Sequence, residues 1–145
     1  MSAADGRISL GRDSQVIVIG PFGQIEFSVV TSFNSKQSTK TIHVDPLSGP
    51  PLEQHVPAGW TGELAVERAD SAADDLFSNM ESSFWSNGLL PLSTLFHYVN
   101  EPNGGSSIYK YNNVAMHLSD GGTWKSDSSV AQRIAFFAST REKVQ

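Results

Sequence analysis

Apolar and polar residues alternate along the first part of the chain. Residues 15–19 form a short β-branched run, and the sequence Gly-Pro-Phe-Gly follows at residues 20–23. In residues 24–31 apolar side chains alternate with polar ones, which is the period of a strand that buries one face. Proline at the second turn position and glycine at the fourth are typical of a type I turn, so these segments predict a hairpin.

The next part of the chain is first polar and then rich in proline. Residues 32–40 are mostly polar and too numerous for a tight turn, and residues 39–45 resume an extended pattern. This pattern predicts a hairpin whose projecting tip is the polar stretch. Residues 45–59 contain four of the seven prolines, which predicts a loop, since proline lacks the N–H that helices and sheets use. A loop of this length is usually functional or ordered by a partner.

The hydrophobic period changes after residues 60–67, which read as another strand with one apolar face. From Asp70 onward apolar residues recur every three or four positions, and this spacing predicts an amphipathic helix that ends at Gly88. We expect one face of this helix to be buried, and the residues that form that stripe are Ala69, Ala73, Leu76, Phe77, Met80 and Phe84.

The start of the predicted helix carries acidic and capping residues. Asp70 or Ser71 is placed to cap it, and Ser71 and Asp74 approximate a capping box. Asp74 and Asp75 put negative charge at the positive end of the helix dipole. Paired carboxylates can also serve acid–base catalysis, but helix stabilisation accounts for the same residues.

The second half of the chain predicts a β-meander. Turn sequences at residues 100–105 and 119–122 divide segments that are rich in β-branched and aromatic residues. The predicted strands are 92–100, 106–112, 114–118, 123–127 and 130–139. The whole chain, residues 1–145, is therefore expected to form one mainly β (α+β) domain. That domain is a β-sandwich or barrel of about seven to eight strands with one flanking amphipathic helix.

Composition and charge narrow the functional classes. The 145 residues include 39% hydrophobic residues, enough for one core, and no cysteine, so neither a disulfide framework nor a thiolate metal site is available. The net charge of −5 disfavours attractive binding to a nucleic-acid backbone. The N-terminus does not read as a signal peptide, and no apolar run approaches the length that spans a membrane, so we expect no membrane anchoring.

Candidate chemistry is sparse. The four histidines lie on different predicted elements without a short metal-ligand spacing, and no nucleophile elbow or phosphate-binding loop is present, so we expect no metal, no cofactor and no catalysis. The tryptophans and eight phenylalanines can line a ligand pocket or fill the core. The tryptophans are Trp60, Trp85 and Trp124, and the histidines are His43, His55, His97 and His117.

The order of these features resembles a known family. A strand opens with Gly59, Trp60 and Gly62, a helix ends near Gly88, and a later strand leads into an Asn-acidic-Pro turn at residues 100–102. Taken together with the size, this order is similar to the tail tube proteins of contractile bacteriophages, which are related to the tube of type VI secretion. The likeness covers most of the chain.

The resemblance implies a structural virion protein and no enzyme. Such proteins form six-fold rings that stack into a hollow tube, and the inner sheets of neighbouring subunits join to line a lumen through which DNA leaves the particle. The partners implied are further copies of the chain, the tail sheath protein, the tape measure protein and the baseplate. The protein is then located in the phage tail of the virion after assembly in the host cytoplasm.

The resemblance also suggests roles for individual residues. Candidate lumen-facing residues are Glu26, Ser28, Glu63 and Glu67, because an acidic wall avoids retaining phosphate. A flexible N-terminal arm at residues 1–14, the tip at 33–40 and the Pro-rich contact loop at 45–59 are expected to join subunits or rings. Within them the candidate contact residues are Arg7, Arg12, Asn34, Lys36, Lys40, Pro46, Pro50 and Pro51.

Two alternatives to the tail tube remain open. The N-terminal extension and the Pro-rich loop depart from the family pattern, which leaves a tube-like baseplate or tail-terminator component as a second structural reading. A small β-barrel that binds an apolar ligand, with the helix as a lid, belongs to a different class and predicts a monomer.

Overall fold

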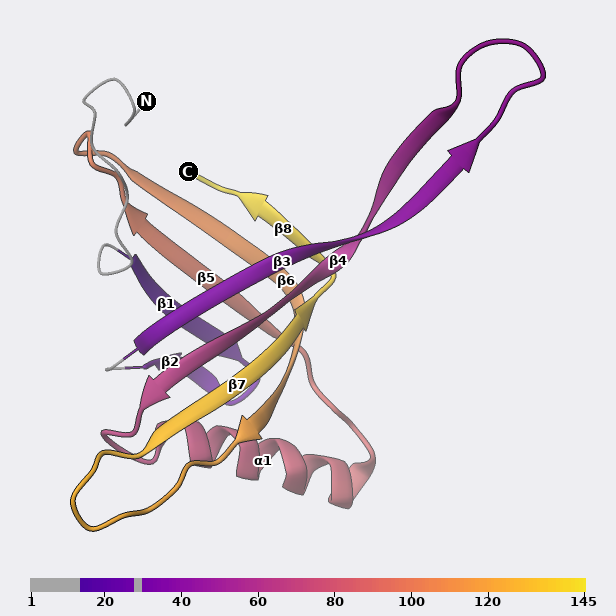
Figure 1. Cartoon of the computed structure of the whole chain (residues 1–145). Coiled ribbons are helices and arrows are strands. Elements are labelled where there is room, and N and C mark those ends of the chain that lie inside the picture. Colours follow the sequence, from indigo (N-terminus) through magenta and orange to yellow (C-terminus); the bar gives the residue numbers. More distant parts are fainter. Residues whose placement is uncertain (1–13, 28–29) are drawn as a thin grey trace.

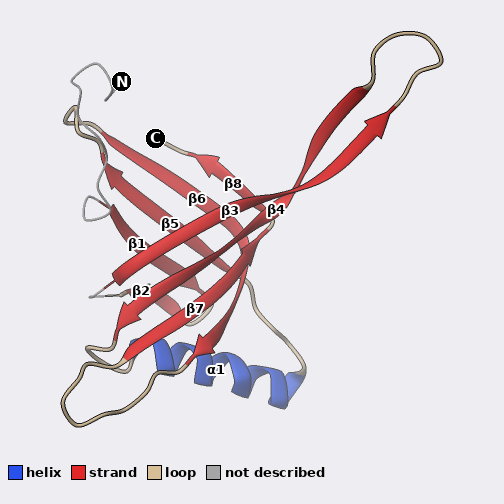
Figure 2. Ribbon diagram, in the orientation of Figure 1, coloured by secondary structure: helices blue, strands red, loops and turns tan. Residues whose placement is uncertain are grey.

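The computed structural model describes residues 14–27 and 30–145. Arg7, Arg12 and Ser28 lie outside the described residues, as does the N-terminal arm up to residue 13. Figures 1 and 2 show the strands as two layers, with one helix across one end of them. The elements in chain order are β1 (Ser14–Gly20), β2 (Gly23–Glu26), β3 (Val30–Val44), β4 (Leu52–Glu67), α1 (Ala72–Asn87), β5 (Ser93–Asn100), β6 (Ser106–Asp120), β7 (Ala131–Ala138) and β8 (Thr140–Lys143).

One long strand, β6, connects the two layers. The sheet is antiparallel with the order β2-β1-β5-β6-β7-β4-β3, and β8 pairs with β6. The first half of β6 pairs with β5 and β8, and its second half pairs with β7. Between the halves, Asn113 adopts a positive φ of 52°, beside a register shift against β5. A bulge of this kind bends a strand, so β6 passes from the first layer (β2, β1, β5, β8) to the second (β7, β4, β3).

The expected mainly β fold with one helix is confirmed, but several element boundaries were wrong. The predicted strands 106–112 and 114–118 are one strand, β6, and residues 123–127 lie in a loop. The polar stretch 32–40 is not a hairpin tip, because β3 continues through it to Val44.

The Pro-rich segment is only partly a loop, since β4 begins at Leu52 and the turn is confined to residues 45–51. Pro57 fits inside β4 because it lies opposite Thr39, next to a register shift, and the pairing of β4 with β7 begins only at Trp60. At Pro57 β4 therefore has only one partner strand among the described residues, and proline is tolerated in such edge positions.

The motif glycines allow close contacts within the second layer. Gly59 has a φ of 101°, which side chains rarely adopt. A Cβ atom on Gly62 would lie 2.2 Å from the carbonyl oxygen of Asn34 and 2.6 Å from the Phe136 ring, so no side chain fits between β3 and β4 there. The close approach seats Phe136 under the sheet, where it stacks on Phe33.

Aromatic side chains fill the space between the layers. Tyr111 is fully buried, and its hydroxyl donates a hydrogen bond of 3.0 Å to Ser35 Oγ across the core. Phe33 on β3 lies 4.6 Å from the His97 ring on β5, measured between centroids. Arg141 on β8 stacks over Tyr109 at 4.0 Å. Burial, and then the nearby Arg141 charge, lower the pKa of His97 below 6.5.

The helix closes one end of this sandwich. Ala73, Leu76 and Met80 are buried in the common core, whereas Phe84 is 39% exposed and so does not belong to the buried stripe. The helix continues past the sheet, so no other part of the described chain covers its last apolar residues (Figure 1). Ala69 is also exposed, before the helix begins.

The helix ends are held partly as expected: Asp70 and Gly88 act at the two ends, but the capping box of Ser71 and Asp74 does not form. Asp70 Oδ1 accepts the Ala72 N–H, and Ser71 Oγ donates to Asp75 rather than to the backbone. Asp74 forms no capping box, because its two oxygens bind Arg68 Nε and Gln132 Nε2, both at 2.9 Å. Those contacts fasten the start of α1 to the end of β4 and to β7. At the other end Gly88 is left-handed, as expected from its position.

The burial difference along the helix gives a first test. We expect Leu76→Asp to prevent folding, because Leu76 is 2% exposed and a carboxylate there must be desolvated or protonated at a cost of several kcal/mol. The half-exposed position gives Phe84→Asp a much smaller effect, and the exposed Glu81→Lys is the control. Circular dichroism melting of the three variants measures this, and a Leu76→Asp protein as stable as Glu81→Lys would show that the helix is not docked through this stripe.

The lowered pKa of His97 gives a second test. The unfolded chain takes up a proton at this residue below about pH 6.5, while the folded chain resists it. The free energy of unfolding contributed by His97 is therefore complete above pH 6.5 and falls as the pH drops towards the folded pKa. Chemical denaturation between pH 7.5 and 5 should show a smaller loss of stability for His97→Leu than for the wild type. The exposed His117→Leu is the matched control, and an unchanged slope in His97→Leu would contradict the account.

Candidate assembly surfaces

The ends of β3 and β4 leave the body of the protein as a two-stranded ribbon. Residues 39–44 pair with residues 52–57, and among the described strands they pair with nothing else, because β7 reaches only to Trp60 on β4. Figure 1 shows this ribbon, residues 39–57, projecting far from the rest of the chain. Isolated two-stranded ribbons are marginally stable in water, so packing against another surface would stabilise this one.

One face of the ribbon is apolar. The register places Lys40 opposite Val56 and Val44 opposite Leu52, and Ile42 lies between them on the same face. Val44 is 49% exposed and Leu52 is 59% exposed, and Ile42 and Val56 are also largely open to solvent. Four large apolar side chains on one exposed strip are typical of a surface that another molecule covers.

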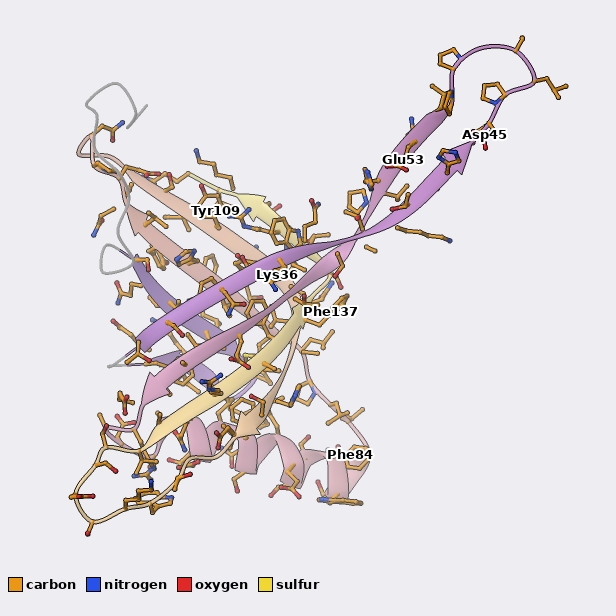
Figure 3. The ribbon with its side chains drawn as sticks, viewed as in Figure 1. Lys36, Asp45, Glu53, Phe84, Tyr109 and Phe137 are labelled. Carbon is orange, nitrogen blue, oxygen red and sulfur yellow. The ribbon has the colours of Figure 1, made fainter. Side chains whose placement is uncertain are left out.

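The opposite face of the ribbon is polar. Glu53 lies 3.1 Å from His55 Nε2 and 3.7 Å from His43 Nδ1, and His43 Nε2 also contacts Asp45 at 3.0 Å. Thr41 Oγ1 contacts His55 Nδ1 at 3.2 Å. Figure 3 shows Asp45 and Glu53 on this ribbon. These side chains are more than half exposed, so the pairs add little stability. In the described chain no group of three or more such residues is arranged to hold a metal ion.

Two strands stand at the ends of the sheet order. β3 ends the second layer and β2 ends the first, so each has one side that pairs with no described strand. Unpaired backbone groups on such edges are templates for pairing with another chain. Asn34 and Lys36, predicted as tip residues, instead lie on the inner half of β3, opposite Glu63 and Thr61.

The predicted lumen residues are divided between the two layers. Glu63 and Glu67 lie on the outer face of β4, with alternate residues Leu64 and Val66 buried beneath. Glu26 lies on β2 in the other layer and accepts a hydrogen bond from Gln15. The three glutamates therefore do not share one face of a single sheet layer, and Ser28 lies outside the described residues.

The outer face around Glu63 carries both charge signs. Arg133 Nη1 on β7 donates to Glu63 Oε1 at 3.2 Å. Lys36 is close by on β3, and His117 lies on β6 opposite Ala135. The uniformly acidic wall expected from the sequence is not what this face presents. It is a mixed, mainly small and polar surface in which one cation is already paired.

A groove runs between α1, the segment that follows it, and β6. It has a volume of about 570 Å³, and its only charged side chains apart from a histidine are Asp74 and Glu81. Trp85 is 75% exposed and donates its Nε1–H to Glu81 at 3.3 Å. The apolar residues that line the groove are Phe77, Met80, Phe84, Trp85, Leu90, Met116 and Leu118. The sequence carried a signal of this surface in the apolar residues Leu89 and Leu90 after the helix, which the pattern did not assign to any element.

Large side chains fill the middle of the interior, and a separate pocket of about 700 Å³ has Val16, Phe27 and Tyr98 among its lining residues. Tyr111, Leu64, Leu95 and Ile134 occupy the space between the layers and are almost completely buried. Trp60 packs edge-on against Tyr111 at 6.2 Å rather than lining a cavity.

In the part of the chain that the structure covers, no helix is long and apolar enough to cross a membrane.

Comparisons with known proteins identify the fold. No protein-family model matches the sequence, and no curated protein is similar to it in sequence. A chain in the extended sheath-tube complex of the PVC extracellular contractile injection system has a TM-score of 0.67 over 97% of this chain and 93% of that chain, at 14% identity. A chain in the PVC sheath/tube terminator gives 0.62 over 90% and 94%, at 14% identity. A chain in the virion of a native gene transfer agent particle gives 0.59 over 95% and 100%, at 11% identity. The expected tail-tube-like fold is thereby confirmed.

Proposed function

We propose that this chain is the building block of a tail tube in a contractile particle, and that its role is structural and not catalytic. The observation that carries the proposal is the ribbon, residues 39–57, whose apolar face has no cover within the described chain. An apolar strip that projects from the body has no evident use in a monomer, whereas repeated copies can cover it. The likeness to a chain of a sheath-tube complex over 97% of this chain supports the same conclusion.

In this proposal six subunits close a ring and the rings stack. The free edges of β3 and β2 supply the backbone groups through which neighbouring subunits extend one another's sheets. Lys40 and the prolines of the turn lie on the ribbon and are assigned to the contacts between copies. The turn prolines are Pro46, Pro50 and Pro51.

The lumen is assigned to the outer face of the second layer, where Glu63 and Glu67 lie. Its charge is mixed, but the Arg133 guanidinium is already bound by Glu63, which leaves it less available to phosphate. DNA would then pass along this face without specific binding. The sheath protein, the tape measure protein and the baseplate are the further partners of such a tube, in a virion that is assembled in the host cytoplasm.

A tube terminator or a baseplate component is the second candidate. Chains from a PVC terminator, from the tube-terminating cap of the anti-feeding prophage and from its baseplate share this fold. The two candidates differ in polymer length, because a tube protein stacks many rings and a terminator forms one.

Shortening the ribbon tests the proposal. We expect a variant in which a two-residue Asn-Gly turn replaces residues 40–56 to fold, because the ribbon pairs only with itself, but to remain monomeric. Light scattering and negative-stain microscopy of the concentrated proteins measure assembly, with the wild type forming rings or tubes. A wild-type protein that stays monomeric at high concentration, and is absent from the tail of the assembled particle, would rule out the tube.

The two ribbon faces provide a matched pair of variants. Val44→Ser with Leu52→Ser removes apolar surface from one face, and His43→Ser with Glu53→Ser removes the same number of side chains from the other. If the apolar face makes the contact, the first pair of changes blocks assembly more strongly than the second. Equal assembly by both would contradict this assignment.

A further inference from the structure

We propose that the groove beside α1 receives the apolar face of the ribbon of a second copy of this chain. The inference rests on the proposed function and names the surface that covers the ribbon. Both surfaces are apolar, exposed and without a partner in the described chain: Val44 and Leu52 on the ribbon, and Phe84, Trp85 and Leu90 at the groove. Each surface can therefore cover the other, and no additional protein is needed.

The positions of the two surfaces require that the contact join different copies. Figures 1 and 3 show the ribbon and Phe84 at opposite ends of the molecule, with the body of the sandwich between them. A ribbon therefore cannot fold back onto its own groove. Two different patches that bind each other form a heterologous, head-to-tail contact, and contacts of this kind propagate into rings or open stacks. A stack of rings needs such a contact between its layers.

The two surfaces also match in length. Each arm of the ribbon, residues 39–44 and 52–57, spans about 20 Å at the rise of a β-strand. The helix α1 has 16 residues and is about 24 Å long at 1.5 Å per residue. The ribbon can thus lie along most of the groove rather than touch it at one point.

Charge complements the apolar match. The apolar face of the ribbon carries one charged residue, Lys40, opposite Val56. The groove carries Asp74 and Glu81, and none of its lining residues is Lys or Arg. Asp74 is already held by Arg68 and Gln132, whereas the exposed Glu81 accepts only the Trp85 Nε1–H, so Glu81 is the carboxylate that a lysine from outside can reach. The polar face of the ribbon, with Asp45 and Glu53, points away from the groove in this arrangement.

Cysteine cross-linking tests the contact, because the natural chain has no cysteine. Val44→Cys and Trp85→Cys are placed in one full-length chain, and both positions are at the surface, so folding is not at risk. Under assembly conditions followed by oxidation we expect a ladder of dimers, trimers and longer species on a non-reducing gel. Each single variant should stay monomeric on the gel, and a mixture of the two single variants should stop at the dimer.

The matched control is Val44→Cys with Ser86→Cys, because Ser86 is exposed next to Trp85 but does not line the groove. This pair should give no ladder. If Val44→Cys alone gives dimers, ribbons pair with each other and the inference is wrong. Normal tubes without a cross-link in the Val44/Trp85 pair would overturn the groove contact while leaving the proposed tube intact.

Two other outcomes distinguish a different occupant of the groove from a failure of the proposed function. If the thiol of Trp85→Cys reacts freely with maleimide in bare tubes and is protected only after sheath protein is added, the groove belongs to the sheath and the inference fails. If the wild-type chain forms no polymer at all, the proposed function fails first and this contact fails with it.

Discussion

The strands β3 and β4 extend beyond the rest of the sheet, and the assembly proposed for this chain depends on the ribbon that they form there. Within the body, β4 has neighbours on both sides, β3 and β7. Beyond Trp60 only β3 remains beside β4, so the hydrogen bonds between these two strands continue but their side chains no longer face the first layer, which would bury them. The result is a ribbon whose two strands pair with each other but whose apolar face is uncovered, and hydrophobic burial between copies can cover that face.

The body of the protein serves to hold that ribbon at a fixed angle. The bend at Asn113 lets β6 belong to both layers, and Tyr111 and Phe33 fill the space between them. The close approach at Gly62 brings β3 against β4 where the ribbon leaves the sheet. The helix is fastened by Asp74 to β7 and, through Arg68, to the segment that follows β4. Ribbon and groove are therefore attached to one packed core rather than to independent loops.

The sequence predicted the elements with strong local signals. The helix from Ala72 to Asn87 and its end at Gly88 followed from a regular period and a left-handed glycine, both of which are local properties. The Pro-rich strand was missed because the rule against proline assumes a strand with two neighbours, and Pro57 has one. Phe84 was placed in the core because periodicity shows which face a residue occupies but not where the covering sheet ends. The groove depends on Met116 and Leu90, which are distant in sequence, so only the tertiary structure brings them together.

The central claim is that assembly buries the apolar face of the ribbon. Cryo-electron microscopy of assembled particles, at a resolution that shows side chains, tests it most directly. We expect stacked rings in which Ile42, Val44 and Leu52 are covered by the next copy and the ribbon bridges two subunits. A ring or tube in which the ribbon extends into solvent, with these three side chains uncovered, would contradict it.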